Sequence, residues 1–326
     1  MATGPRPTRR RMLAAALAAL PVPALALLPA TATLLVPGPE TGALAEWSGR
    51  LAAALARGST SAVMLGRSVL GGPDGVTAAN RFATAAAPDG RTLLVLPGAA
   101  AQARLVGDPR ARFDGAGWVP VCAVQGPAVL AGLGRPPAAT APLRLGLAAP
   151  DQAGIAALLG LDLIGHAATP VLGLAGPRGE AALAQGAVDA VVLQGGDCLP
   201  RLAALGAQPW FVLDETRDAA LPEVPAVAEL ATGGDAALRA GLLAAASNAR
   251  LLGALLLPAL TPGDVVALWR AAAQRWLEEE RGALNPGIRL TAGGDLAPVF
   301  SPLAPPPEAV VAYRDWLFRR LRWKPD

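Results

Sequence analysis

The sequence contains few side chains of the kinds that carry out covalent, acid–base or metal chemistry. Its one histidine is His166, and its two cysteines, Cys122 and Cys198, lie far apart in the chain. One histidine and two separated cysteines do not form a metal cluster of ordinary ligand spacing. Asp189 and Asp197 have no sequence neighbour that marks an acid–base pair. We therefore expect no bound metal, no cofactor and no catalytic residue.

Sequence motifs for common nucleophilic and phosphate-binding sites are also missing. The chain has no G-x-S-x-G elbow, no G-x-G-x-x-G segment and no phosphate-binding P-loop, and its only lysine is Lys324. An exported α/β enzyme that uses His166 as its base is an alternative, and it would need an unmarked nucleophile. The sequence argues against an enzyme.

What remains is a set of loops of small residues, each directly after an apolar run of strand length. In open parallel sheets, ligands bind at the carboxyl ends of the strands, and free N–H groups at helix starts attract anions. Any one of these loops alone is an ordinary turn, whereas four in one chain favour capture of a small anion by backbone groups. The candidate ligand contacts are Thr41, Gly42 and Ala43; Gly98 and Ala99; Ala148 and Ala149; and Asp151, Gln152 and Gln194.

These loops need a sheet to position them, and apolar runs alternate with helical segments along most of the chain. The run 92–96 has no polar alternation, which is typical of a strand covered on both faces. Alternating strands and helices predict an α/β fold with mostly parallel sheets. We expect strands at 33–36, 61–65, 92–96, 118–124, 128–131, 143–147, 169–172, 190–193 and 209–213, and helices at 45–56, 78–87, 153–163, 179–185 and 199–205.

The last third of the chain has a different pattern. We expect a helix over 238–252, a short strand over 255–260 and a second helix over 262–281. Thr261 is the expected N-cap of that second helix, followed by proline at the first helical position. A final helix begins near Pro307, and its apolar stripe is typical of packing against a core. The stripe consists of Tyr313, Trp316, Leu317 and Leu321.

The first 32 residues have the pattern of an export signal. Four arginines precede an apolar stretch that two prolines interrupt, and no acidic residue occurs before Glu40. Small residues predict cleavage after Ala26 or after Ala32, and the prolines disfavour a retained membrane anchor. The segment 8–13 fits a twin-arginine signal, and an ordinary Sec signal fits equally well. We therefore expect a periplasmic protein that is exported by one of these two routes.

Removal of the signal changes the charge balance. The four signal arginines belong to the 28 basic residues, so the mature chain has 24 basic and 25 acidic residues. No basic patch is interleaved with aromatic residues, so nucleic-acid binding is not expected. Beyond the signal, the apolar run 251–260 is too short to span a bilayer.

Cys122 and Cys198 are expected as two buried thiols, with a disulfide between them as the alternative.

Four segments of the chain together resemble the periplasmic substrate-binding proteins of tripartite tricarboxylate transporters, the Bug family. They read VPGPETGA at 36–43, GRSVLGG at 66–72, AAAPDGRTLLVLPG at 85–98 and ALPEVPAVAEL at 220–230. The segments occur in the family's order, and the likeness extends over essentially the whole mature chain. The patterns A-P-D-G-x-T-L-L and L-P-x-V-P-x-V-A-E are the specific ones, whereas the glycine-rich pieces are not.

The resemblance implies the two-domain architecture of periplasmic binding proteins, each domain a mostly parallel sheet flanked by helices. It implies that a small organic acid is held between the domains by loop amides and ordered waters, and is then delivered to membrane subunits of the transporter. An opening and closing hinge would accompany ligand capture. We place one domain at 33–126 plus 254–326 and the other at 127–253, with hinge crossings near Gly126 and Ala254. We expect a monomer.

The chain departs from the family pattern where side-chain donors would be expected. Residues 42–46 read Gly-Ala-Leu-Ala-Glu where the family has two glycines followed by Ser-Thr-Asp. Residues 145–152 lack the serines of the corresponding family loop, and 192–194 read Val-Leu-Gln in place of Phe-Asp-Asn. We therefore expect a ligand that is smaller or more apolar than citrate. The alternative is an exported accessory or sensor protein with a degenerate ligand site that acts by binding a membrane partner.

Overall fold

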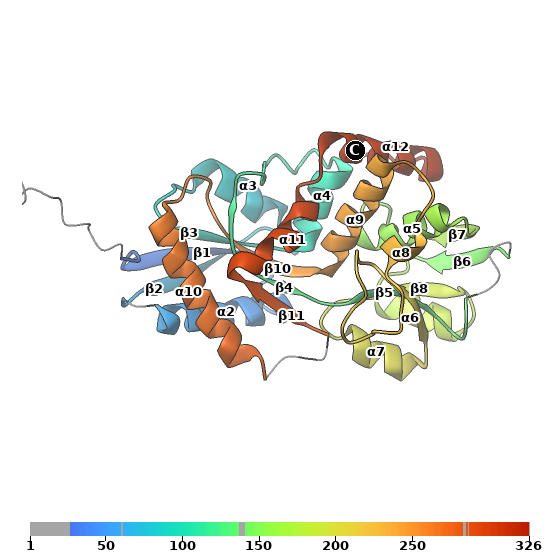
Figure 1. Ribbon diagram of the computed structural model, residues 1–326, viewed down its shortest axis with the longest axis horizontal. Coiled ribbons are helices and arrows are strands. Elements are labelled where there is room, and N and C mark those ends of the chain that lie inside the picture. Colours follow the sequence, from blue (N-terminus) through green and yellow to red (C-terminus); the bar gives the residue numbers. More distant parts are fainter. Residues whose placement is uncertain (1–26, 60, 137–140, 283–284, 286, 326) are drawn as a thin grey trace, which may run out of the picture.

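Two β-sheets, each covered by helices on both faces, form two lobes that lie side by side (Figure 1). The computed structural model describes residues 27–59, 61–136, 141–282, 285 and 287–325. The predicted α/β architecture with two helix-flanked sheets is confirmed. Within the described residues, no helix combines the length and the apolar character that crossing a bilayer requires.

The first lobe is built on a six-stranded sheet with the order β11-β4-β10-β3-β1-β2. β1 pairs in parallel with β2 and β3, whereas β10 is antiparallel to both of its neighbours. The strands are β1 (Thr31–Pro37), β2 (Met64–Leu70), β3 (Thr92–Leu96), β4 (Val119–Gln125), β10 (Leu251–Leu257) and β11 (Arg289–Ala292). The helices are α2 (Ala43–Gly58), α3 (Val76–Ala85), α4 (Gly98–Val106), α10 (Gly263–Glu280) and α11 (Ala297–Phe300), with short η2 (Gly293–Leu296) and η3 (Ser301–Leu303).

The second lobe is built on a five-stranded sheet with the order β7-β6-β8-β5-β9. β6 is parallel to β7 and β8, and β5 is antiparallel to β8 and β9. The strands are β5 (Ala128–Gly132), β6 (Leu143–Gly146), β7 (Ala168–Val171), β8 (Ala190–Gln194) and β9 (Gln208–Val212). The helices are η1 (Ala153–Ile155), α5 (Ala156–Ile164), α6 (Pro177–Ala184), α7 (Cys198–Leu205) and α8 (Val227–Leu230); α9 (Ala236–Arg250) and α12 (Pro307–Leu321) pack against them.

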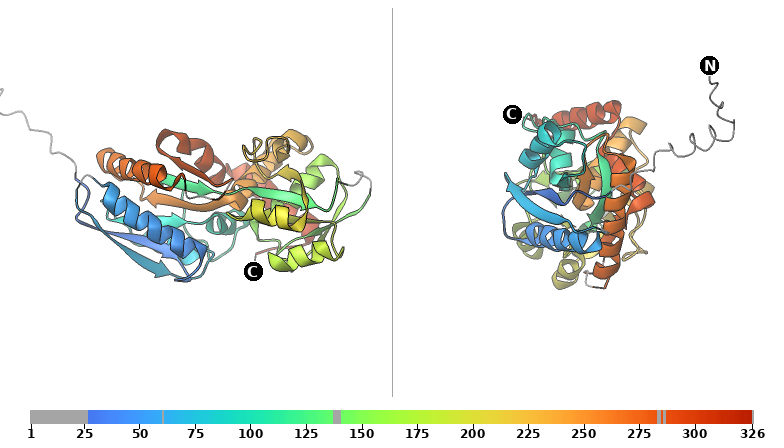
Figure 2. Two further views of the ribbon diagram at one scale, coloured as in Figure 1. Left: turned by 90° about the horizontal axis from the view of Figure 1, so that it is seen from below. Right: turned by 90° about the vertical axis from the view of Figure 1, so that its left-hand side faces the viewer.

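The alternation of side chains along the central strands explains why these strands are apolar throughout. In β3, Leu93 and Val95 pack into the cluster beneath α2 and α10, whereas Leu94 and Leu96 pack into the cluster beneath α3. Figure 2 shows α2 and α3 on opposite sides of this sheet. Because both faces of β3 are buried, each of its leucines contributes hydrophobic stabilisation of about 1.5–3 kcal/mol.

Helices α4, α9 and α12 pack together between the two sheets (Figure 1). Tyr313 and Leu317 of α12 and Leu105 and Val106 of α4 share one buried cluster with α5, α9 and the second-lobe sheet. The chain passes from the first sheet to the second between β4 and β5, and returns where α9 continues directly into β10. The domain boundaries near Gly126 and Ala254 remain predictions.

A buried group of charged side chains occupies the point where α9 continues into β10. The side chain of Arg250, the last residue of α9, is 5% exposed and pairs with Asp214; a nitrogen of its guanidinium lies 3.8 Å from Asp218. Arg289 of β11 donates to Asp214 at 3.1 Å. The Arg250 carbonyl accepts from Gly126 N–H at 2.9 Å, so this one residue touches both crossings between the sheets. Burial lowers the pKa of Arg250, and Asp214 opposes that shift.

Two expected segments differ because local sequence did not reveal their neighbours. The strand expected at 61–65, with a glycine-rich loop after it, is shifted to Met64–Leu70. This strand lies at the sheet edge and pairs residue by residue with β1, so it needs no apolar alternation. Helix α4 was not expected, because Pro97 to Ala100 reads as a loop; the helix begins at Gly98 itself.

The boundaries near the start of α10 also differ from expectation. The helix expected over 238–252 ends at Arg250, and β10 occupies Leu251–Leu257 rather than 255–260. Thr261 is not the N-cap of α10, because Pro262 takes that position. The Thr261 hydroxyl instead donates to the carbonyl of Pro258 at 2.8 Å, which satisfies the preceding turn.

The export-signal prediction falls mostly on residues 1–26, which lie outside the described residues. The chain that follows is already part of the first lobe. Leu28 is 4% exposed and belongs to the cluster beneath α2 and α10. β1 begins at Thr31, and Met64 N–H donates to the Ala30 carbonyl at 2.9 Å.

The two cysteines are separate buried thiols. Cys122 lies in β4 and Cys198 begins α7, and each is unpaired and fully buried. Burial raises the pKa of each thiol to about 12. The sulfur of Cys198 donates to the Leu193 carbonyl at 3.4 Å.

A chromogenic disulfide reagent tests this arrangement. In mildly alkaline buffer the native protein should not react, because both thiols are inaccessible and stay protonated. The protein unfolded in guanidinium without reductant should titrate two thiols per chain. A titre of zero in the unfolded protein would contradict the unpaired state.

Replacement of Arg250 should destabilise the fold. Arg250→Gln removes the buried partner of Asp214 and Asp218, and loss of one member of a buried charge group costs about 3–5 kcal/mol. The matched control is Arg57→Gln, which breaks the exposed pair between Arg57 and Glu279 at 3.0 Å and should cost less than about 1 kcal/mol. The measurement is the free energy of unfolding in urea, and equal losses for the two variants would contradict a structural role for Arg250.

Candidate functional site

The four loops of small residues lie at the carboxyl ends of β1, β3, β6 and β8, two in each lobe. η1, which follows the β6 loop, packs against α4 of the first lobe. After β8, Gly196 lies against the first lobe, since an added Cβ would be 3.0 Å from Ile288 and 3.7 Å from Leu252. The second-lobe loops therefore face the first lobe. We call these four segments the inter-lobe loops: residues 38–43, 97–99, 147–152 and 194–197.

The helices that begin at the inter-lobe loops have no side-chain N-caps. The N-cap residues of α2, α4, η1 and α7 are Gly42, Pro97, Gln152 and Asp197, and none of their side chains accepts a bond from the helix. In α9, by contrast, the Asp235 carboxylate accepts from Leu238 N–H at 2.7 Å. The first N–H groups of a helix have no partner within it. Some of these groups already have backbone partners, since Cys198 N–H of α7 donates to the Gly195 carbonyl at 3.2 Å and Ala100 N–H of α4 donates to the Pro97 carbonyl at 3.1 Å. The N–H groups at the starts of α2 and α4, Ala43, Gly98 and Ala99, are the ones left for a ligand or for water.

Two of the predicted contact residues are glycines for different physical reasons. Gly42 has φ +102°, a conformation that side chains disfavour, and an added Cβ would meet nothing within 4 Å. A Cβ added to Gly98 would overlap the carbonyl oxygen of Asn248 and lie 2.8 Å from that of Leu251. The small size of Gly98 is therefore required by the packing of α4 on the end of α9, whereas Gly42 presents open backbone.

A pocket of about 270 Å³ lies between α4 and the start of η1, and we call it the inter-lobe pocket. Among the predicted contacts, Ala99, Asp151 and Gln152 line it. Thr41, Gly42, Ala43, Gly98, Ala148, Ala149 and Gln194 do not. The full lining consists of Pro73, Asp74, Ala99, Gln102, Ala103, Val106, Asp108, Arg110, Asp151 and Gln152.

The side chains of the inter-lobe pocket carry an excess of negative charge. Arg110 is its single cation, and this guanidinium already binds Asp74 at 3.0 Å and Asp108 at 2.6 Å. Hydrogen bonding to Arg110 holds the pKa of Asp108 below its usual value, and the pKa of Arg110 is raised in turn. Asp151 adds a third carboxylate. An acidic ligand would find no free cationic side chain in this pocket.

The remaining predicted contacts lie along the loops outside the inter-lobe pocket. Thr41, Gly42 and Gln194 are exposed, and Ala148 and Ala149 are half-buried. The Ala148 carbonyl accepts from Gly173 N–H at 2.9 Å, and the Ala149 carbonyl accepts from Gln152 N–H at 3.2 Å. Ala43 is the first residue of α2. That these residues bind a ligand remains a prediction.

The candidate base His166 lies away from these loops. It follows the last turn of α5, where its N–H donates to the Leu161 carbonyl at 2.9 Å, and it precedes β7. It therefore lies at the amino end of that strand, opposite the edge where the inter-lobe loops gather. Within the described ranges, no group of three or more His, Cys, Asp or Glu side chains is arranged to hold a metal ion.

Sequence patterns did not reveal several polar residues near the lobe junction. Gln102 lines the inter-lobe pocket, and Arg250 forms the buried charge group. Both interrupt alanine-rich or leucine-rich stretches, AAAQARL and SNARLLGALLL. The sequence signal that could have identified both residues is a single polar residue within an apolar run. A polar side chain buried in an apolar core normally has a hydrogen-bond partner there.

Solved structures share this fold at low sequence identity. A TctC solute-binding protein from Polaromonas, with no ligand, is 16% identical and aligns over 89% of this chain and 98% of its own, with a TM-score of 0.66. MatC from Rhodopseudomonas palustris with bound malate is 20% identical, with coverage of 88% and 98% and a TM-score of 0.52. The periplasmic binding protein BugD is 15% identical, with coverage of 91% and 99% and a TM-score of 0.53. No family model and no curated protein matches the chain.

The likeness extends over nearly the full length of each of these proteins, two of which, the TctC protein and BugD, are binding proteins by name. It matches the resemblance that the four sequence segments predicted, and at these identities it concerns the fold. The chain has the two-lobed α/β fold of the TctC and Bug solute-binding proteins.

Proposed function

We propose that this protein is an exported solute-binding protein that captures a small carboxylate-containing metabolite between its lobes. The observation that carries the proposal is the pair of helix N-termini without side-chain caps that follow β1 and β3, those of α2 and α4. Backbone N–H groups at helix starts bind carboxylates without a cationic side chain. MatC, which has the same fold, holds malate.

The charge of the site limits the acid that it would accept. The inter-lobe pocket has three carboxylates and one paired guanidinium, so a tricarboxylate would be repelled there. The neutral side-chain donors of the loops are Thr41, Gln152 and Gln194. We therefore propose a mono- or dicarboxylate, held mainly by the N–H groups of Gly42, Ala43 and Ala99 and the backbone at Ala148 and Ala149. Asp151 lines the inter-lobe pocket, where its carboxylate would repel a ligand that carries additional negative charge.

After capture, the protein would deliver its ligand to a membrane transporter, as the resemblance to the Bug family implies. We propose that the protein acts in the periplasm, as a monomer, and passes its ligand to membrane subunits of a tripartite tricarboxylate-type transporter. The lobes would move relative to each other at the crossings near Gly126 and Ala254, and the ligand would shift the population toward the closed form.

A thermal-shift screen of mono-, di- and tricarboxylates tests the proposal. A ligand that binds only the native protein raises its melting temperature, and a concentration of 100 times Kd adds about 2.7 kcal/mol of stability. We expect a mono- or dicarboxylate to stabilise the protein and citrate to do so weakly. If no acid stabilises it at millimolar concentration, capture is contradicted, and the alternative of an accessory protein that binds a membrane partner takes its place.

Ala43→Pro should weaken binding of the acid that the screen identifies. Ala43 is the first residue of α2, where proline is compatible with the helix and removes one free N–H group. Loss of a hydrogen bond to a charged group should raise Kd about tenfold or more. The matched control is Gly263→Pro, which likewise places proline at the first residue of a helix, here α10, away from the loops. Equal affinities for the two variants in calorimetric titration would contradict the assignment of the α2 N-terminus.

The mature protein should begin at Leu27. Cleavage after Ala32 would remove the buried Leu28 and the first two residues of β1, and loss of a buried leucine costs about 2–5 kcal/mol. Cleavage after Ala26 leaves both intact. The intact mass of the periplasmic protein distinguishes the two sites, and a mature chain that starts at Thr33 would contradict the prediction.

A further inference from the structure

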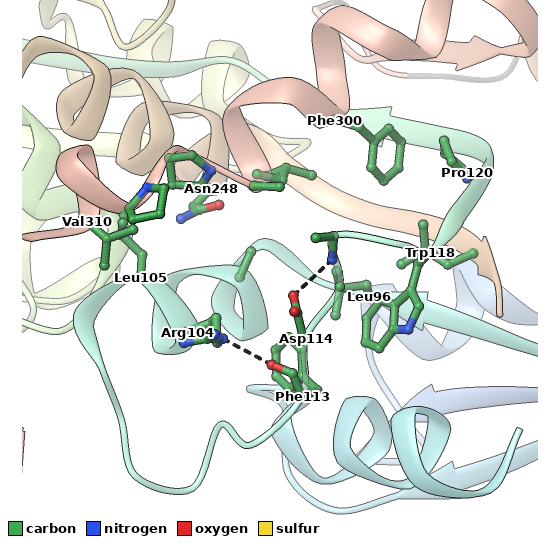
Figure 3. Close-up of a pocket in the computed structure, with 18 of the residues that line it drawn as sticks. Leu96, Arg104, Leu105, Phe113, Asp114, Trp118, Pro120, Asn248, Phe300 and Val310 are labelled. Atoms are coloured by element: carbon green, nitrogen blue, oxygen red, sulfur yellow. Dashed lines mark hydrogen bonds between the residues drawn. The ribbon is translucent and has the colours of Figure 1, made fainter. Parts of the chain in front are cut away.

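A second and larger cavity lies between the first lobe and helices α9 and α12, apart from the inter-lobe loops (Figure 3). Its volume is about 550 Å³, within the range of sites for small organic ligands. It is enclosed by α4, the segment before β4, β10, α9 and the C-terminal segment from α11 to α12. No residue of the inter-lobe loops lines it. The inferred site is therefore independent of the function proposed above.

One end of the cavity is aromatic and apolar. Phe113 and Trp118 stack with their ring centroids 5.5 Å apart, and Trp118 also meets Phe82 edge-on at 5.1 Å. Figure 3 shows Trp118, Phe300 and Pro120 together at this end. Trp118 and Phe300 are only half-buried, so part of each ring is available to an occupant. This end is suited to an apolar or aromatic group.

The other end carries two arginines. Arg104 donates through Nε to the Phe113 carbonyl at 3.0 Å, and Arg314 donates to the carbonyls of Leu105 at 2.8 Å and Arg104 at 2.9 Å. Across the described part of the chain, neither guanidinium has a carboxylate oxygen within 4.0 Å, and three of their terminal nitrogen positions have no acceptor. Burial, and then the charge of Arg104, lower the pKa of Arg314. The pair is suited to a carboxylate, which arginine binds with two parallel hydrogen bonds.

Asn248 adds a buried polar atom without a partner. The side chain is 4% exposed, and its amide nitrogen donates to Gln102 at 3.0 Å. Gln102 donates in turn to the Tyr313 hydroxyl at 3.2 Å. The amide oxygen of Asn248 has no hydrogen-bond partner, and Figure 3 shows the amide directed into the cavity. A buried acceptor of this kind is costly unless something donates to it.

The cavity lining contains one carboxylate, that of Asp114, and this group does not neutralise the two arginines. Asp114 is exposed, and its carboxylate accepts from Ala116 N–H at 3.1 Å in a local turn. The lining therefore has two guanidiniums and one carboxylate, whereas the inter-lobe pocket has one guanidinium and three carboxylates. The side chains that line the two sites therefore differ in the sign of their net charge.

We propose that this cavity is a second ligand site, specific for an amphipathic hydroxy acid. The carboxylate of the ligand binds Arg104 and Arg314, its hydroxyl donates to the amide oxygen of Asn248, and its apolar body packs on Phe113, Trp118 and Phe300. Charge complementarity and the unpartnered amide together define this occupant. A hydrocarbon without polar groups would leave the two guanidiniums and the Asn248 amide oxygen without partners.

3-Phenyllactate is the probe, because it has one carboxylate, one hydroxyl and one phenyl ring. At millimolar concentration it should raise the melting temperature of the mature protein and change the fluorescence of Trp118. Trp118→Phe should abolish that fluorescence change while the thermal stabilisation remains. 3-Phenylpropanoate, which lacks the hydroxyl, should bind about three- to tenfold more weakly, and 3-phenyl-1-propanol, which lacks the carboxylate, at least about tenfold more weakly.

Arg104→Gln is the decisive variant. Arg104 is exposed and makes one hydrogen bond, to the Phe113 carbonyl, which a glutamine amide can replace. The substitution should raise the Kd of 3-phenyllactate roughly tenfold. Arg81→Gln, an exposed arginine on α3, is the matched control and should leave the Kd unchanged. Circular dichroism of both variants confirms that they are folded.

Four results would overturn the proposal, and the first three concern the probe and the two arginine variants. They are no stabilisation by 3-phenyllactate, equal affinity for the acid and the alcohol, and equal affinity of the Arg104→Gln and Arg81→Gln variants. Ala43→Pro separates this site from the inter-lobe loops, because it should leave 3-phenyllactate binding unchanged. Loss of phenyllactate binding in Ala43→Pro would assign the probe to the inter-lobe loops and reject the second site.

Discussion

The buried guanidinium of Arg250 is the interaction on which the arrangement of the two lobes depends. α9 belongs to the core that contains the second-lobe sheet, and β10 is a central strand of the first-lobe sheet, with no loop between them. Arg250 stands at that joint, neutralised by Asp214 from the end of β9, while its carbonyl binds Gly126 at the other crossing. A buried charge is costly once its partner is lost, so Arg250 and Asp214 favour the arrangement in which both crossings stay in contact with Arg250.

The same joint sets the position of α4 and hence of one inter-lobe loop. Because Gly98 has no side chain, the first turn of α4 lies directly on the carbonyls of Asn248 and Leu251. The first free N–H groups of α4 are thereby held at the lobe junction, beside Asp151 and Gln152. Packing within the protein and the proposed presentation of backbone to a ligand would thus depend on the same few residues. A larger residue at Gly98 would disturb both.

The sequence predicted those elements whose burial is visible in a local pattern. The unbroken apolar run of β3 and the small-residue turns at strand ends placed the sheets and the inter-lobe loops close to where they lie. β2 was misplaced because it is an edge strand that pairs with one neighbour only and has no buried residue. Its sequence therefore includes Arg67 and Ser68 and shows no apolar run. The roles of Gly98 and Arg250 depend on Asn248 and Asp214, partners that are distant in sequence and that no local window reveals.

Charge separates the inter-lobe pocket from the cavity beside α4 more sharply than shape does. In the inter-lobe pocket the one guanidinium is already bound by two carboxylates, so an acid could be held there only by backbone N–H groups and neutral side-chain donors. Backbone donors bind any carboxylate that fits, and they discriminate by position rather than by side-chain identity. The cavity beside α4 has the reverse arrangement, with unpaired guanidiniums and a specific amide. Selectivity through charged side chains, which the inter-lobe loops lack, is therefore available in the cavity beside α4.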